Sequence, residues 1–157
     1  MKQRKQVSVK HNIRSNFSFA PPEDNESAWR SSLETFEEAL TRAFPGAIAE
    51  ARTSALRGDT VLNFDIELAP DVWVSGTAAM PAPDYASVGL IDVTADEAAV
   101  FAQWLRDTYL PSRNCVRFLS SFVMENGDET PWPLPSKGDA QALAETMRRH
   151  IATEQAE

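Results

Sequence analysis

The side chains that most often carry catalysis are sparse in this sequence and lack the spacing that catalysis needs. The chain of 157 residues has two histidines, His11 and His150, near opposite ends, and one cysteine, Cys115. Neither histidine belongs to an H-E-x-x-H pair, so no histidine metal centre is predicted. A single cysteine excludes an internal disulfide and a zinc site built on several thiolates. We expect Cys115 to be a small buried thiol at the start of a core strand.

Motifs for phosphate, dinucleotide or acyl chemistry do not occur either. The glycines are isolated, and the sequence has no G-x-G-x-x-G, no P-loop and no G-x-S-x-G elbow. Adjacent carboxylates do occur, at 37–38, 96–97 and 128–129, but a helix exterior, a helix cap and a turn account for them. The sequence therefore predicts no catalytic residue, no metal and no cofactor.

One segment combines charge with a rigid aromatic side chain. The acidic turn 125–129 precedes Trp132, which stands between Pro131 and Pro133. A tryptophan held by prolines loses little entropy on binding, and acids beside it would attract a basic partner. The alternative is that Trp132 packs into the core and the prolines cover a sheet edge.

A second acidic group is predicted on the first helix, for which Asn25 or Ser27 is the expected cap. Apolar residues recur on one face of the predicted helix, and Glu34 and Glu38 lie on the opposite face with Glu37 at its flank. This ridge is either a binding surface or an ordinary solvated face. The candidate partner-binding residues are therefore Glu34, Glu37, Glu38, Glu125, Asp128, Glu129 and Trp132.

The charge is distributed unevenly along the chain. The net charge is −8, yet the first fifteen residues hold five basic and no acidic side chains, so the remainder carries −13. A body this acidic repels nucleic acid and favours a basic protein partner or plain solvation. No apolar run reaches the roughly 18 residues of a membrane helix, and no secretory signal follows the basic start. We expect no membrane partner and a cytoplasmic location.

The predicted architecture is organised around a β-hairpin in residues 60–80. Apolar residues alternate with polar ones over 62–68, turn chemistry interrupts at 69–71, and Val72-Trp73-Val74 resumes the strand. With a three-residue loop, Trp73 would share the face of Glu67. With a two-residue loop, it would join Leu68 on the buried face.

The other elements follow from periodicity and caps. Odd apolar positions in 1–22 predict an edge strand blunted by Lys10 and Arg14, with a nucleic-acid-binding arm as the alternative. Strands are also predicted at 48–56, at 87–93 and at 115–124, the last placed centrally beside 87–93. A capping box at 94–97 begins the second helix, and Asp139 caps the third.

This order predicts a single α+β domain spanning 1–157. We expect a mainly antiparallel sheet of about five to six strands with three helices, mostly on one face. The basic segment 1–22 is its edge strand or a flexible arm.

Three functions fit these observations. The first is a non-enzymatic acidic module that neutralises a basic protein; a small, acidic α+β chain without catalytic motifs is similar in general style to bacterial toxin-immunity proteins, and this resemblance implies a toxin-like partner. The second is a small-molecule-binding or enzymatic domain with a pocket between sheet and helices, lined by Phe64, Trp104 and Phe118. The third is an assembly module that self-associates through a strand edge and the apolar residues of 115–124.

Overall fold

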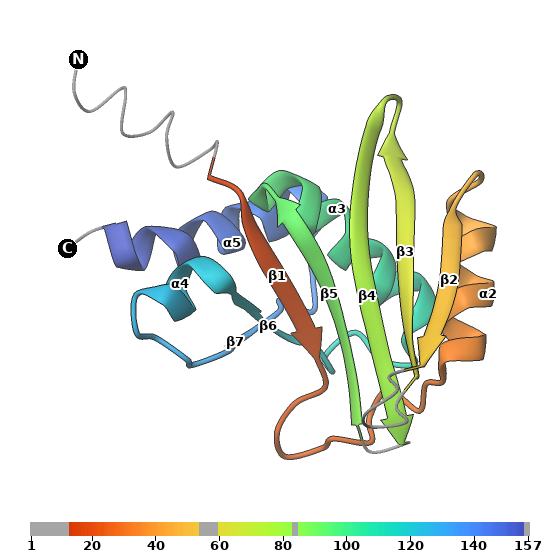
Figure 1. Ribbon diagram of the computed structural model, residues 1–157. Helices are drawn as coiled ribbons and strands as arrows, with labels where there is room; N and C mark the ends of the chain where they lie inside the picture. The colour runs from red at the N-terminus through yellow and green to blue at the C-terminus, as the bar shows by residue number, and fades with distance from the viewer. Residues whose placement is uncertain (1–12, 54–59, 83–84, 156–157) are drawn as a thin grey trace.

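One antiparallel sheet of seven strands organises the computed structural model, which describes residues 13–53, 60–82 and 85–155 (Figure 1). Across the sheet the strand order is β2-β3-β4-β5-β1-β6-β7. The strands are β1 Ser15–Ala20, β2 Ile48–Thr53, β3 Thr60–Ala69, β4 Val72–Ala82, β5 Tyr85–Val93, β6 Arg117–Ser120 and β7 Trp132–Pro133. The described helices are α2 Leu33–Ala43, α3 Ala95–Trp104, the π-helical η1 Leu105–Tyr109, α4 Ser121–Glu125 and α5 Ala140–Gln155.

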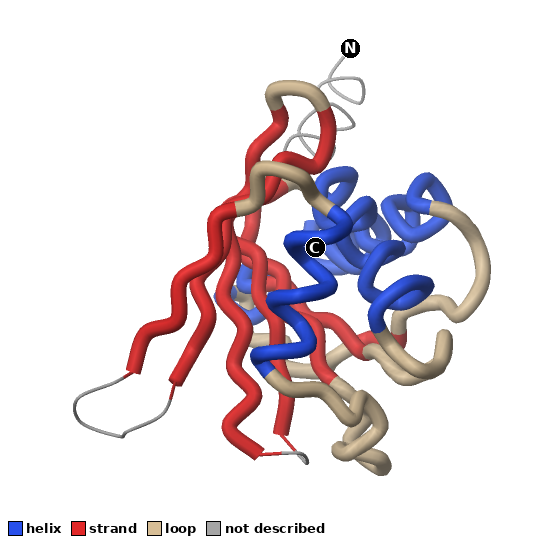
Figure 2. The backbone as a smooth tube through the Cα atoms, turned by 90° about the vertical axis from the view of Figure 1, so that its right-hand side faces the viewer, coloured by secondary structure: helices blue, strands red, loops and turns tan. Residues whose placement is uncertain are grey.

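The sheet and the helices form two layers, and the helices lie on one side of the sheet (Figure 2). Strand alternation explains this arrangement, because Phe17, Leu62, Phe64 and Leu90 point to the helix side and are buried. The helices contribute Phe36, Phe101, Leu143 and other apolar residues to the same core. The predicted α+β class and the antiparallel sheet are thus confirmed.

The sheet has one or two more strands than predicted and the helical layer one more α-helix. The added helix, α4, replaces the second half of the strand predicted for 115–124. The hydroxyl of Ser120 accepts the backbone N–H of Val123 at 3.3 Å, and Ser15 Oγ accepts that of Phe122 at 3.0 Å. These bonds satisfy the first free N–H groups of a helix, so the strand ends at Ser120.

The predicted neighbour of this strand is also wrong. β1 pairs with β5 on one side and with β6 on the other, so β6 and the strand at 85–93 are separated by β1. β1 is consequently an interior strand rather than the predicted edge strand, and Phe17 and Phe19 are fully buried in it. The rest of that prediction, for residues 1–12, lies outside the described residues.

The first helix begins later than its apolar periodicity predicted. Ser32 is the N-cap, and its side chain and that of Thr35 form a reciprocal capping box. Arg30, two residues earlier, has a φ of 48°, which is incompatible with a continuous helix from 25 or 27. Trp29 is buried in the core outside any helix, and its indole N–H donates to the carbonyl of Cys115 at 2.6 Å.

The β3–β4 hairpin resolves the position of Trp73. The loop has two residues, since Ala69 pairs with Val72, and Asp71 takes a φ of 62°. A β-bulge next to this turn shifts the register, so Trp73 pairs with Glu67 and lies on the exposed face. A two-residue loop predicted that Trp73 would join Leu68 on the buried face, but the bulge places Trp73 on the exposed face with Glu67.

The remaining elements agree with the sequence. β5 and the Thr94–Glu97 capping box of α3 form as predicted, and Leu143, Met147 and Ile151 of α5 point into the core. β2 forms over Ile48–Thr53, and the last part of the strand predicted for 48–56 lies outside the described residues. Among the described residues, every helix is too short or too polar to cross a membrane.

Candidate functional site

The face of the sheet opposite the helices is the candidate functional site, and we call it the open face. In one cross-strand row, Ile48, Asp65, Ser75 and Ile91 pair in sequence across β2, β3, β4 and β5. Ile48 is 61% exposed, Ile91 is 50% exposed, and Trp73 in the next row is 49% exposed. An antiparallel sheet with one solvated face normally presents polar side chains there. Three large apolar side chains on this face are therefore the feature that needs an explanation.

Cross-strand hydrogen bonds hold the polar side chains of the open face in place. Ser75 Oγ donates to Asp65 Oδ1, and Thr77 Oγ1 donates to Asn63 Oδ1 at 2.9 Å. Glu67 accepts the backbone N–H of Asp71 at 2.9 Å, which fixes its carboxylate at the hairpin end. The acceptors on β3 are thus oriented before any partner arrives.

The acids at the edges of the open face are paired with arginines, whereas those at its centre and hairpin end form no ion pair with any described residue. Glu50 is paired with Arg52 at 3.3 Å, and Arg14 binds both Asp92 and Glu97. In the described part of the chain, no arginine or lysine lies within ion-pair distance of Asp65, Glu67 or Asp71. The centre and hairpin end of the open face are therefore acidic.

The open face is hollowed beside β2, and we call this the sheet hollow. It has a volume of about 260 Å³ and is lined by residues of β2, β3, β4 and β5. Its lining includes Ile48, Glu50, Arg52, Asn63, Asp65, Ser75, Thr77 and Ile91.

The structure does not bring the two predicted acidic groups together. Glu34, Glu37 and Glu38 lie on α2, which packs behind β2, β3 and β4, whereas the 125–129 turn follows α4 beside β6 and β7 at the other end of the sheet (Figure 1). Glu38 is paired with Arg42 at 3.1 Å. Each group remains a separate predicted binding surface.

Trp132 is half-buried in β7 at the β6 edge. Its ring lies edge-on to His150, with centroids 5.0 Å apart, and 6.3 Å from Phe118. β7 pairs with β6 through Phe118↔Trp132, so the proline segment does cover this edge of the sheet. Trp132 therefore has a packing role, and its predicted partner contact would use its remaining exposed edge.

A serine–histidine pair is present but closed to substrates. His150 Nε2 lies 3.0 Å from Ser120 Oγ and 3.3 Å from the Ser120 amide, and both residues are buried. Ser120 Oγ also accepts the N–H of Val123 as the α4 cap. A nucleophile must reach a reacting carbonyl. We assign this pair to the packing of α5 on β6.

Burial lowers the pKa of His150 to about 4 against a small opposing effect of Asp128. Because the unfolded chain binds the proton near pH 6.5 and the folded chain near 4, stability is retained above pH 6.5 and falls as the pH drops toward 4, by about 3 kcal/mol in all. An NMR ring titration in His11→Ala, where His150 is the sole histidine, should show the low pKa. An ordinary pKa above 6 would contradict this prediction.

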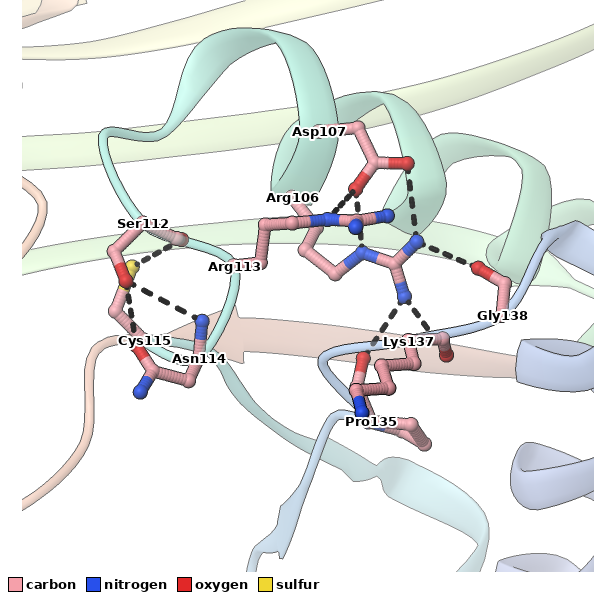
Figure 3. Close-up of polar contacts among 9 residues, drawn as sticks. All are labelled: Arg106, Asp107, Ser112, Arg113, Asn114, Cys115, Pro135, Lys137 and Gly138. Carbon is pink, nitrogen blue, oxygen red and sulfur yellow. Dashed lines mark hydrogen bonds and ion pairs between the residues drawn. The ribbon is translucent and has the colours of Figure 1, made fainter.

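Arg106, Asp107 and Arg113 form the other polar cluster, and Cys115 lies in a separate group with Ser112 (Figure 3). Arg106 is fully buried in η1 and donates to Asp107 and to the carbonyls of Pro135, Lys137 and Gly138. Its hydrogen bond to Asp107, with help from Arg113, lowers the pKa of that carboxyl to about 2. This cluster ties η1 to the loop before α5.

Cys115 is unsuited to nucleophilic chemistry. Its thiol is buried and donates to the Ser112 carbonyl at 3.0 Å, and burial raises its pKa. A nucleophilic cysteine needs the opposite shift, toward the thiolate. The predicted buried thiol is confirmed, at the entry to β6.

A proline-lined groove lies at the end of the sheet away from the hairpin turn of β3 and β4. It encloses about 620 Å³ and includes the ion pair of Glu23 and Arg117 at 2.9 Å. The groove lies between the loop at 22–23, residues 114–117 and the 130–136 segment. The residues predicted to line a pocket between sheet and helices pack instead against aromatic neighbours, as Phe64 does against Phe36 and Phe101.

The described residues contain no group of three or more histidine, cysteine, aspartate or glutamate side chains that could hold a metal ion. Comparison with known proteins found no matching family model, no matching curated protein and no matching solved structure. The function therefore has to be argued from the sites of this chain.

Sequence reasoning missed the open face as a site. Ile48 and Ile91 occupy the outward positions of strands that the sequence did predict, so a count of apolar residues at outward positions would have found them. Trp73 was left between two faces because the bulge beside the turn carries no clear sequence signal.

Proposed function

We propose that this chain is a non-catalytic protein-binding module that neutralises a basic, toxin-like protein partner through its open face. The observation that carries the proposal is the exposure of Trp73, Ile91 and Ile48 beside Asp65, Glu67 and Asp71, acids that form no ion pair with the described residues. The interaction would be of the inhibitor or immunity type, in which the partner is held rather than transformed.

The composition of the open face supports this proposal. Tryptophan is enriched among the residues that dominate protein interfaces, where a large side chain is buried with few rotatable bonds. Trp73 and Ile91 are diagonal neighbours, because Ile91 pairs with Ser75, two residues along β4. Together they form an apolar surface, and a partner that covers this surface removes it from water, which favours binding.

Charge supports a basic partner in particular. Glu67 pairs with Trp73, Asp65 pairs with Ser75 in the next row, and Asp71 lies in the adjoining turn, within a chain whose net charge is −8. Acidic surface of this kind speeds encounter with a basic protein and disfavours an acidic one. Binding should therefore weaken as salt concentration rises.

The proposal is tested by affinity capture from cell lysate at low and high salt, with wild-type protein and with Trp73→Ala. We expect a basic protein to be captured stoichiometrically at low salt, and Trp73→Ala to weaken its affinity by about 2 kcal/mol, or roughly thirtyfold. Val100→Ala is the matched control, because Val100 is an exposed apolar residue of α3 in the helical layer.

Three results would overturn the proposal: equal capture by Trp73→Ala, a captured protein that is not basic, or no dependence on salt. Two further variants separate the surfaces predicted from the sequence. Neutralising Glu34, Glu37 and Glu38 tests the α2 ridge, and neutralising Glu125, Asp128 and Glu129 tests the acidic turn. We expect both to change affinity less than Trp73→Ala.

The proline-lined groove supports a second candidate function, the binding of a small molecule. Its 620 Å³ falls within the range of about 300–1,000 Å³ that is usual for ligand pockets. A thermal-shift screen tests this candidate. A ligand whose stabilisation is lost in Thr130→Arg, at an exposed residue of the groove, but kept in Trp73→Ala would place small-molecule binding in the groove.

A further inference from the structure

We infer that the sheet hollow binds one long cationic side chain, arginine or lysine, presented by the partner. This inference rests on the proposed function, since it names the group that the open face recognises. It follows from the size of the hollow, from the acceptors on its floor and from the apolar residues at its sides.

The size of the sheet hollow suits a single side chain. Its volume of about 260 Å³ is below the range of about 300–1,000 Å³ in which whole small-molecule ligands usually bind. The hollow is also open to solvent on the uncovered side of the sheet, so a side chain projecting from another protein can enter it directly.

The floor of the hollow offers oriented acceptors. Ser75 holds Asp65 through Oδ1, and no described residue donates to the second carboxylate oxygen, which can accept an N–H donor from outside. Asp65 belongs to β3, an interior strand, and its neighbours Asn63 and Thr77 are bonded to each other. A cation at this position would therefore meet a carboxylate that is already fixed, and would lose little affinity to reorganisation.

The charge balance within the hollow also favours a cation. Arg52 lies on the β2 side, but its guanidinium is engaged by Glu50 at 3.3 Å, so these two charges offset each other. Asp65 then supplies the uncompensated charge. Removing Arg52 should consequently improve the binding of a cation, and removing the charge of Asp65 should abolish most of it.

The sides of the hollow suit the methylene stem of a long side chain. Ile48 and Ile91 flank the Asp65–Ser75 pair within the same cross-strand row. Lysine and arginine commonly bury their stems on apolar surface while the charged end reaches a polar group. Contact with such a stem would also explain why Ile48 and Ile91 are apolar although they are exposed.

The test uses small probes, so that it does not depend on the partner. The N-acetyl amides of arginine, lysine and norleucine are titrated into the ¹⁵N-labelled full-length chain at constant ionic strength. We expect saturable shifts of the Asn63, Ser75 and Thr77 amides with arginine and lysine, and none with norleucine, which has the stem without the charge. The relative affinities of arginine and lysine identify the preferred cation.

Variants at the hollow give opposite expected effects. Asp65→Asn should weaken cation binding about tenfold, and Arg52→Gln should strengthen it about twofold. Glu37→Gln, on α2 behind the sheet, is the control and should have no effect. Because one variant loses affinity and the other gains it, a general loss of folding cannot mimic the pattern.

The inference is overturned if norleucine shifts the same amides as lysine, or if Asp65→Asn binds as wild type does. Its failure differs from that of the proposed function. Capture of a basic protein that depends on Trp73, with no probe binding in the hollow, would overturn the inference and leave the proposed function standing. Probe binding in the hollow without capture of any basic protein would overturn the proposed function and leave cation binding by the hollow standing.

Discussion

Replacing Arg106 with alanine is expected to lower the free energy of unfolding by about 3–5 kcal/mol. The side chain is fully buried, and its guanidinium donates to the carbonyl oxygens of Pro135 at 2.9 Å and Gly138 at 2.6 Å. Alanine would remove the donors from these part-buried carbonyls and would open a cavity where the fully buried side chain lay. Urea unfolding followed by circular dichroism measures the loss.

The matched control for Arg106 is Arg113, which binds the same carboxylate of Asp107 at 3.0 Å but is 57% exposed. Because exposed ion pairs contribute little, Arg113→Ala should cost less than about 1 kcal/mol. Arg106→Lys should still be clearly destabilised, since an ammonium cannot reproduce the fork of donors that reaches Asp107 and the carbonyls together. Equal unfolding free energies for the Ala variants at 106 and 113 would contradict this view of the cluster.

Arg106 also shows what the sequence could not reveal. Nothing in its neighbourhood distinguishes it from a surface arginine on a helix, because its carbonyl partners lie about thirty residues further along the chain. Similarly, the buried indole of Trp29 donates to the distant carbonyl of Cys115. Trp29 therefore belongs to the core without belonging to a helix, and the helix begins at Leu33, after the Ser32 cap.

The strands and caps that could be predicted are those that depend on local patterns. Alternation over β3 and the capping box at Thr94 each specify an element within a few residues. The order of strands across the sheet could not be predicted in this way. β1 inserts between β5 and β6, and no local pattern encodes that neighbour choice.

The candidate site illustrates the same limit. The predicted binding acids were chosen because they cluster in sequence, yet α2 and the 125–129 turn lie at opposite ends of the sheet (Figure 1). Strand pairing brings Asp65 into one row with Ser75 and Ile91, which are 10 and 26 residues further along the chain. A surface assembled across four strands cannot be found by scanning the chain in order.

Gly76→Ala is the second substitution with a large expected effect, a loss of about 3 kcal/mol in the free energy of unfolding. Gly76 pairs with Phe64 of β3 and Leu90 of β5, two buried residues, at the floor of the sheet hollow. An added Cβ would lie 2.8 Å from Phe64 Cε1, closer still to its Cζ, and 2.5 Å from the carbonyl oxygen of Gly89. The ring is packed between Phe36 and Phe101, so it cannot simply move away.

The neighbouring strand supplies the control, Gly89→Ala. A Cβ there would meet Phe17 O at 3.7 Å and Ser18 Oγ at 4.0 Å, which are ordinary contacts, and its backbone has no positive φ. Alanine should therefore be neutral or stabilise the strand by about 0.5–1 kcal/mol through reduced chain entropy. If thermal and urea unfolding place both variants within 1 kcal/mol of each other, the close packing of Phe64 beneath Gly76 is wrong, and with it the floor that positions Asp65 and Ser75.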